Sequence, residues 1–288
     1  MRQQITKFYA SICVSLCLLM GQVMSAAYDD ADARVALLTG GSRGIGFAFA
    51  EELLKEGIKV FVVVRDKKTL TGLQEAYPEL LRVIEADLST CEGQMKVVAE
   101  APFHIHYVIH NAAVINPLGP EALLDPASMK ALATLTQVNI MAPTIINAGL
   151  GERIRGARVL MVSSRAGDAM VSGLGAYCAA KTWMDVYMES LQMDKPKGVL
   201  AAAVHPGDVD TGMQEDLRKP AVGIFPKTEL FREWKAENKL LSPKVSADYL
   251  TWLLLRTDTA YFTSMKHDIY NVEHHSEWLR GRVLPFTK

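Results

Sequence analysis

Tyr177 and Lys181 are the two side chains whose types and spacing could carry proton transfer. They are four residues apart in a segment with helical periodicity, so both side chains would lie on one face of a helix. A tyrosine titrates at about 10, and a neighbouring ammonium favours the phenolate and lowers that pKa. Tyr177 could then give a proton to a carbonyl oxygen or take one from an alcohol. An isolated pair at this spacing is more often a solvated helical contact, so the surrounding sequence must decide.

The elements that must position this pair alternate between short apolar runs and helix-like segments. The runs are Val35–Thr39, Val60–Val64, Arg82–Ala86, Tyr107–Ile109, Val159–Ser163 and Val199–Val204. The helix-like segments are Ile45–Lys55, Lys68–Tyr77, Gln94–Glu100, Ser128–Leu150 and Ala176–Met193. Most runs are apolar at consecutive positions, which is typical of strands buried on both faces. The pattern predicts an α/β fold, with one Rossmann-type, doubly wound parallel sheet and helices on both faces.

Residues 34–288 are expected to form a single domain, since no internal repeat or flexible linker divides them. The stretch 208–241 breaks the strand–helix rhythm. It is charged, contains Pro220 and Pro226, and has no strand character, which favours a substrate lid. Ser242 followed by a proline then predicts the start of a further helix, Pro243–Arg256.

The amino terminus has the pattern of a targeting segment. Residues 1–27 begin with the basic Arg2 and Lys7, continue through a nearly uncharged block at 8–24, and end in small residues. This order matches a secretory signal peptide. An uncleaved membrane anchor is the second interpretation, and a cytoplasmic protein that starts at Met24 is the third. The localisation therefore stays open.

Composition excludes several classes of protein. The chain has 288 residues, is 49% hydrophobic and 22% charged, and carries a formal net charge of -1. These values argue against disorder, a multi-span membrane protein and a general nucleic-acid binder. Only Cys91 and Cys178 lie outside the amino-terminal block. Two isolated cysteines do not make a disulfide framework.

A glycine-rich turn joins the first predicted strand to the first predicted helix. It contains Gly40, Gly44 and Gly46. Glycines let the backbone approach phosphates closely, and the helix N-terminus adds free N–H groups and a positive dipole end. In this setting the turn predicts a site for a dinucleotide pyrophosphate, with a tight structural turn as the alternative.

Two arginines favour NADP over NAD. An acid at the end of the second strand would bind the ribose hydroxyls of NAD, but Val64 stands there. Arg43 in the turn and Arg65 after the strand could both face a ribose 2′-phosphate, because guanidinium suits phosphate bidentately. An ion pair between Arg65 and Asp66 is the alternative.

The glycine-rich turn and six further segments, in this order, resemble the motifs of the short-chain dehydrogenase/reductase family. The matching segments are Thr39–Gly46 (TGxxxGxG), Asp87-Leu88, Asn111-Ala112-Ala113, Asn139, Ser163-Ser164, Tyr177–Lys181 (YxxxK) and Pro206–Thr211 (PGxVxT). His110 and Ala113 depart from the family's NNAG segment, and Phe262–Asn271 lacks the glycines common near its last strand. The ordered set implies a single-domain nicotinamide oxidoreductase.

The resemblance implies a catalytic role for Asn139, Ser164, Tyr177 and Lys181. Tyr177 would be the general acid/base, and Lys181 would also hold the nicotinamide ribose hydroxyls. The family's serine lies thirteen residues before the tyrosine and often has a glycine three residues after it, which selects Ser164 over Ser163. Ser164 would stabilise negative charge on the substrate oxygen. Asn139 would hold a water that relays protons toward Lys181.

The resemblance also implies a cofactor site, and the sequence between Ser164 and Tyr177 suggests a substrate site. The cofactor residues would be Gly40, Ser42, Arg43, Gly44, Ile45, Gly46, Arg65, Asp87, Leu88, Asn111, Ala112, Tyr177, Lys181, Pro206, Gly207, Val209 and Thr211. Met170 and Leu174 would line the substrate side, with Phe225 and Trp234 from the lid, which suggests an apolar or aromatic carbonyl compound. No metal site is expected: His267, His274 and His275 match no compact ligand spacing.

The function that these residues predict is NADP(H)-dependent reduction of a ketone or diketone. The stretch 210–214 is similar to the corresponding stretch of sepiapterin reductase and bacterial benzil reductases, which are carbonyl reductases. The alternative is a non-catalytic NADP-binding scaffold or sensor. The family also implies a homodimer or homotetramer, and contact with a membrane is expected only if 8–24 remain as an anchor.

Overall fold

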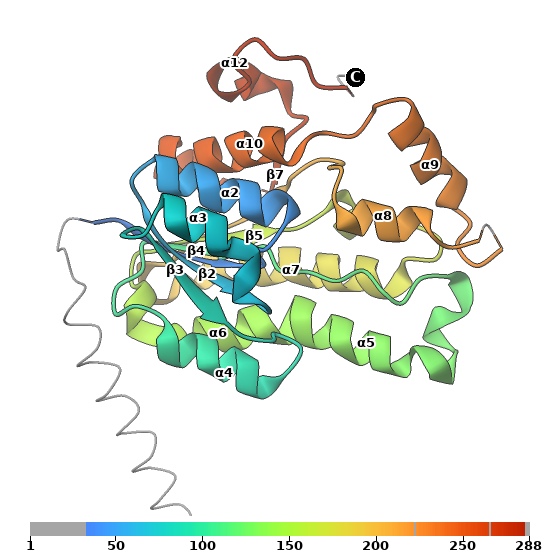
Figure 1. The fold of residues 1–288 in the computed structure, drawn as a ribbon, viewed down its shortest axis with the longest axis horizontal. Coiled ribbons are helices and arrows are strands. Elements are labelled where there is room, and N and C mark those ends of the chain that lie inside the picture. The colour runs from blue at the N-terminus through green and yellow to red at the C-terminus, as the bar shows by residue number, and fades with distance from the viewer. Residues whose placement is uncertain (1–32, 222, 265, 286–288) are drawn as a thin grey trace, which may run out of the picture.

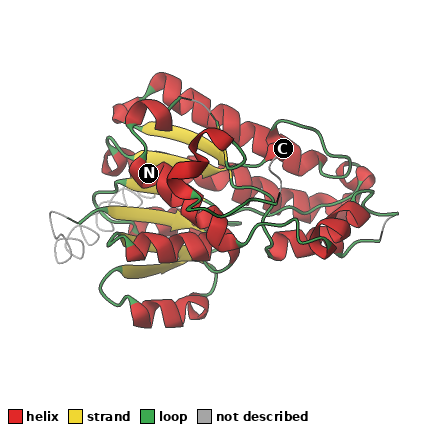
Figure 2. Ribbon diagram, turned by 90° about the horizontal axis from the view of Figure 1, so that it is seen from above, coloured by secondary structure: helices red, strands yellow, loops and turns green. Residues whose placement is uncertain are grey.

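The computed structural model describes residues 33–221, 223–264 and 266–285, so the predicted targeting segment 1–27 lies outside the described residues. Seven parallel strands form one sheet in the order β3-β2-β1-β4-β5-β6-β7. The strands are β1 (Val35–Thr39), β2 (Lys59–Val64), β3 (Leu81–Glu85), β4 (Tyr107–His110), β5 (Arg158–Val162), β6 (Leu200–His205) and β7 (His267–Asp268). Helices cover both faces of the sheet (Figures 1 and 2), so the predicted doubly wound fold is confirmed.

Helices lie in two layers around the sheet and also outside these layers. They are α2 (Gly44–Lys55), α3 (Thr71–Ala76), α4 (Cys91–Glu100), α5 (Met129–Thr136), α6 (Ala142–Leu150), α7 (Gly175–Asp194), α8 (Gly212–Arg218), α9 (Thr228–Ala236), α10 (Pro243–Arg256), α11 (Thr259–Phe262) and α12 (His275–Trp278). In Figure 1, α2, α3 and α10 lie on one side of the sheet and α4, α5 and α6 on the other. Within the described residues, no helix combines the length and the apolar composition needed to cross a membrane.

The consecutive apolar residues of the strands are explained by burial on both faces. Leu38 and Val62 pack in the core shared with α2 and α10, whereas Leu37 and Val63 pack in the core shared with α4, α6 and α7. Alternate side chains of each strand therefore enter opposite layers. The sheet order reverses between β1 and β4, and such a switch point opens a crevice at the carboxyl ends of the strands.

The helix predicted over 128–150 is interrupted. α5 ends at Thr136, a π-helical turn spans Gln137–Met141, and α6 follows. Pro143 has no N–H to donate to the carbonyl four residues earlier, which is that of Asn139. The side chain of Asn139 also forms two hydrogen bonds with the backbone of Val114. The wider turn accommodates both constraints at a position that the resemblance marks as functional.

The carboxyl-terminal part completes the sheet without the glycines that the family commonly has there. β7 is only two residues long and pairs in parallel with β6, with Asp268 opposite His205. The stretch 208–241 leaves and rejoins the domain at one point, where the Asp210 N–H donates to the Leu241 carbonyl at 2.9 Å. Between these ends the stretch forms α8 and α9.

Candidate active site

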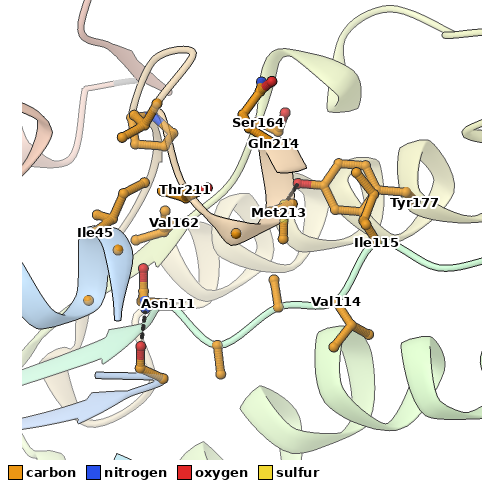
Figure 3. Close-up of a pocket in the computed structure, with 18 of the residues that line it drawn as sticks. Ile45, Asn111, Val114, Ile115, Val162, Ser164, Tyr177, Thr211, Met213 and Gln214 are labelled. Carbon is orange, nitrogen blue, oxygen red and sulfur yellow. Dashed lines mark hydrogen bonds between the residues drawn. The ribbon is translucent and has the colours of Figure 1, made fainter. Parts of the chain in front are cut away.

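A cavity of about 770 Å³ lies at the carboxyl ends of the strands (Figure 3). Every residue predicted to bind the cofactor lines it, together with Ser164 and Leu174. Two predicted site residues are not part of the wall. Asn139 is buried behind it, and Met170 points outward with 77% of its surface exposed. The prediction that Met170 lines the substrate side is therefore wrong, because the turn before α7 directs that side chain to solvent.

The side chain of Asn111 fixes the backbone of the glycine-rich turn by two hydrogen bonds. Its Nδ2 donates to the carbonyls of Thr39, at 3.1 Å, and Gly40, at 2.9 Å, which joins the ends of β1 and β4 (Figure 3). Gly40 has a φ of +73°, and a Cβ there would lie 2.7 Å from the Cα of Ala112. Arg43, the N-cap residue of α2, makes no side-chain capping bond. The free N–H groups at this helix end fit a pyrophosphate.

The two arginines that favour NADP occupy different parts of the cavity wall. The carboxylate of Asp66 accepts a bond from the N–H of Lys68 at 2.9 Å and caps the following turn, so the alternative Arg65–Asp66 ion pair is not formed. Arg65 lies near Asp87. The bond from the Ser89 N–H is the main cause of the lowered pKa of Asp87, and Arg65 adds to it. The guanidinium of Arg43 reaches toward α8, because a Cβ built at Gly212 would lie 2.9 Å from its Nη1.

Tyr177 and Lys181 both lie on α7, and both are buried. The Lys181 Nζ donates to the Val162 carbonyl at 2.8 Å and lies 5.5 Å from the centroid of the Tyr177 ring. The Tyr177 hydroxyl donates to the Met213 Sδ at 3.6 Å (Figure 3). Ser164 follows β5 and caps the short helical turn Arg165–Gly167, where its Oγ accepts from the Ala166 N–H at 3.2 Å. The predicted hydroxyl and ammonium groups therefore meet at one side of the cavity.

The predicted lowering of the Tyr177 pKa is not what the structure shows. Burial raises the pKa of Tyr177 well above its ordinary value, and hydrogen bonding with Ser164 offsets only part of this. Burial also lowers the pKa of Lys181 to about 8, against the opposing charge of Asp185. The ammonium is bonded to Val162 rather than to the phenol, so desolvation of the phenolate dominates. Tyr177 thus keeps its proton at neutral pH.

Asn139 acts on the cavity through the backbone of Val114. Its Oδ1 accepts from the Val114 N–H at 2.9 Å, and its Nδ2 donates to the Val114 carbonyl at 2.8 Å. Both polar ends of this fully buried side chain are therefore used to fix the wall after β4. The predicted water relay stays a prediction.

The stretch 208–241 contributes residues that the sequence analysis did not assign to the site. Met213 and Gln214 of α8 line the cavity, and so does Phe231 of α9. The carbonyl-reductase-like stretch 210–214 was the available signal for the first two. Of the two predicted lid aromatics, Trp234 lines the cavity. Phe225 does not, because it is fully buried against Phe231.

The carboxyl-terminal histidines make internal hydrogen bonds. His267 bonds the Phe262 carbonyl at 2.9 Å, His275 bonds the Ile269 carbonyl at 3.0 Å, and His274 bonds Glu277 at 2.7 Å. Among the described residues, the side chains that come close enough to share a metal ion are a different set: Asp168, Asp185 and His205. The Lys266 ammonium already lies between the two carboxylates of that set and offsets part of their charge.

His110, a departure from the family motif, is buried behind the turn. Its Nε2 bonds the Asn147 Oδ1 at 2.9 Å, and burial lowers its pKa to about 4 from an ordinary 6.5. The folded chain therefore keeps His110 neutral where the unfolded chain binds a proton.

This difference predicts an acid-sensitive fold. Between pH 6.5 and 4 the unfolded state binds the extra proton, so the free energy of unfolding should fall by about 3 kcal/mol as the pH decreases. Urea unfolding at pH 7.5 and pH 4.5 measures the change. His110→Asn should lose this part of the pH dependence, and an unchanged pH dependence in that variant would show that another group causes it.

Known proteins resemble this chain over most of its length. A family model described as short chain dehydrogenase matches residues 34–221. A benzil reductase ((S)-benzoin forming) of Bacillus cereus is 29% identical over 77% of this chain and 94% of its own. The crystal structure of the KRED1-Pglu enzyme is 25% identical, covers 82% of this chain and 100% of its own, and has a TM-score of 0.72. BdcA, solved in complex with NADPH, is 26% identical over 82% of this chain and 92% of its own, with a TM-score of 0.66.

Proposed function

We propose that this chain, which belongs to the short-chain dehydrogenase family, is an NADP(H)-dependent carbonyl reductase acting on a ketone or diketone. The observation that carries the proposal is the position of the Tyr177 hydroxyl. It is buried and neutral, and it lies at the wall of a large cavity between a dinucleotide-type turn and an apolar lid.

The cavity fits a nicotinamide dinucleotide at its glycine-rich end. The uncapped N-terminus of α2 would bind the pyrophosphate, and Arg65 with Arg43 would bind the ribose 2′-phosphate. Lys181 would hold the nicotinamide ribose. Bound there, NADPH supplies the hydride. The NADPH complex of BdcA supports this assignment of the cofactor.

The chain's own residues supply the proton and the charge stabilisation. The neutral phenol of Tyr177 donates its proton to the carbonyl oxygen, and the Ser164 hydroxyl stabilises the charge that develops there. A substrate oxygen that bonds Tyr177 must replace the Met213 Sδ, its present hydrogen-bond partner. Substrate entry therefore requires the start of α8 to shift, and closure of the lid excludes water from the reacting atoms.

Apolar side chains favour an aromatic or bulky apolar substrate. Val171 and Leu174 line one side of the cavity, and Phe231 and Trp234 of the lid line the other. Gln214 adds an amide whose buried Oε1 has no hydrogen-bond partner within the described residues, so a second substrate oxygen or hydroxyl could bond there. The relative from Bacillus cereus is named a reductase of benzil, an aromatic diketone, and this supports the proposal.

A turnover assay tests the function. The purified chain is mixed with NADPH, and oxidation of the cofactor is followed with benzil, a matched aromatic monoketone and an aliphatic ketone. We expect reduction, fastest for the aromatic diketone. No turnover with any carbonyl despite tight NADPH binding would overturn the proposal and favour the scaffold or sensor. The homodimer or homotetramer and the localisation stay predictions, to be checked by light scattering and amino-terminal sequencing.

The arginine assignment predicts a loss of cofactor preference. Arg65→Ala should weaken NADPH binding about 10–100-fold, because a bond to a charged group contributes about 1.5–3 kcal/mol. Binding of NADH, which lacks the 2′-phosphate, should change little. Isothermal titration with both cofactors measures the effect, and Arg43→Ala tests the second arginine in the same way.

Arg256→Ala is the matched control. Arg256, the last residue of α10, forms an ion pair with Glu56 at 2.6 Å and does not line the cavity. It should bind both cofactors as the unmodified chain does. An equal loss of NADPH and NADH affinity in Arg65→Ala would refute the 2′-phosphate assignment.

A further inference from the structure

The turn that carries Ser164 is pressed against the helix that carries Tyr177 and Lys181. A Cβ built at Gly167 would lie 2.5 Å from the Asp185 Oδ2 of α7, so a side chain there would displace this carboxylate. The Thr182 Oγ1 of the same helix donates to the Gly167 carbonyl at 2.9 Å. The relative position of the serine and tyrosine hydroxyls therefore depends on the contact between Gly167 and α7.

An ion cluster closes this contact from outside. The Lys266 Nζ, next to β7, donates to the Asp185 Oδ2 at 2.6 Å and also bonds Asp168, which follows the serine turn. His205, at the end of β6, places its Nε2 3.5 Å from the Asp168 Oδ2. One ammonium thus joins the serine turn, α7 and the edge of the sheet.

Asp185 has features that a purely structural ion pair does not need. Its side chain is only 7% exposed, and its Oδ1 has no hydrogen-bond partner among the described residues. It lies one helical turn after Lys181, and its charge is the one that opposes the effect of burial on the Lys181 pKa. On α7, Tyr177 lies beside Lys181, and the charge of Asp185 acts on it. The other charged or titratable groups that surround Asp185 are Asp168 after the serine turn, His205 on β6, and Lys266 before β7.

We propose that Asp185, held by the Lys266 ammonium that it shares with Asp168, is a positioning residue for the active site that clamps the serine turn to α7 and maintains the positive charge of Lys181. The catalytic part of this inference rests on the proposed function. The electrostatic part concerns Lys181 itself and is independent of any substrate.

Removing a carboxylate and removing the ammonium of this cluster should shift the Lys181 pKa in opposite directions. Asp185→Asn removes a negative charge beside Lys181, so the Lys181 pKa falls and the alkaline limb of the kcat profile moves to lower pH, by about one unit. Lys266→Met leaves the carboxylates without their ammonium, so the same limb moves to higher pH. Lost packing alone would not give shifts of opposite sign.

The experiment measures two properties of each full-length variant. The pH dependence of kcat for carbonyl reduction reports the catalytic effect. The ¹³Cε resonance of Lys181 in lysine-labelled protein, assigned by its absence in Lys181→Met, reports the charge without any turnover. If no carbonyl is reduced, the proposed function fails while the resonance still tests the electrostatic part of the inference.

Asp248→Asn is the matched control. Asp248 is also a nearly buried carboxylate between two cations, Lys244 and Arg282, but it lies on α10 away from the cavity. The Asp248→Asn variant should have an altered thermal stability, but its pH dependence of kcat and its Lys181 resonance should be unchanged. Asp168→Asn is a second test that retains Asp185, and it should shift the profile in the same direction as Asp185→Asn. The proposal would be overturned if the pH at which the Lys181 resonance titrates is unchanged in the variants. It would also be overturned if that pH moves in the same direction in Asp185→Asn and Lys266→Met.

Discussion

Tyr177→Phe should lower kcat for carbonyl reduction about 10²–10⁴-fold, the usual contribution of a positioned general acid. The substitution removes one oxygen from a buried side chain whose ring packs in an apolar cluster. The removed hydroxyl bonds the Met213 Sδ, a weak acceptor, and interacts with Ser164, whose Oγ keeps the Ala166 N–H as a partner. Thermal stability and the Kd for NADPH should therefore change little. Stopped-flow NADPH oxidation and fluorescence titration measure the two quantities.

Tyr187→Phe is the control on the same helix. The Tyr187 hydroxyl accepts from the Asn147 Nδ2 at 3.3 Å and does not line the cavity. Its removal should leave kcat near that of the unmodified chain. Turnover retained in Tyr177→Phe, or lost equally in both variants, would remove Tyr177 from the proposed proton transfer.

The two perturbed groups set the expected pH range of the reductase. Burial raises the pKa of Tyr177, so its phenol keeps its proton through neutral and mildly alkaline pH. Lys181, whose pKa lies at about 8, loses its charge first as the pH rises. Reduction should therefore decline above about pH 8 because the ammonium is lost, and a profile that stays flat well above this value would exclude such a role for Lys181.

The strands could be predicted from sequence because the sheet is buried on both faces. Val60 and Val62 alternate with residues that enter the other layer, so β2 is apolar at every position after Lys59, the one residue by which its limits differ from the prediction. Two-residue β7 has no such pattern, since its pairing depends on β6. The π-helical turn at Asn139 was also hidden, because Pro143 and the distant Val114 backbone create it together.

The candidate site divides in the same way. Residues that short motifs identify, such as Gly40 and Tyr177, line one cavity in the structure. Properties that depend on long-range packing were not accessible. The pKa direction of Tyr177 is decided by its burial, and the contact of Lys266 with Asp185 joins residues 81 positions apart. Helical spacing alone gave the phenol a neighbouring ammonium but not the Val162 carbonyl that binds it.

Gly46→Ala should weaken NADPH binding at least about tenfold and destabilise the fold by about 1–3 kcal/mol. A Cβ at this position would lie 2.2 Å from the Gly40 carbonyl oxygen and 2.4 Å from the Asn111 Nδ2. These two atoms form the 2.9 Å hydrogen bond that joins the turn to β4. Because the obstacle on one side is backbone, the turn itself must move away from the start of α2. Fluorescence titration with NADPH and urea unfolding measure both effects.

Gly72→Ala separates this geometric effect from the general consequence of replacing a helical glycine. Gly72 lies in α3, and a Cβ there meets nothing within 4 Å. Alanine should stabilise that helix by about 0.4–1 kcal/mol, since the unfolded chain loses freedom and the folded chain gains no clash. NADPH binding should be unaltered. If Gly46→Ala behaves like Gly72→Ala, the turn tolerates a side chain, and close approach of its backbone cannot be what forms the phosphate site.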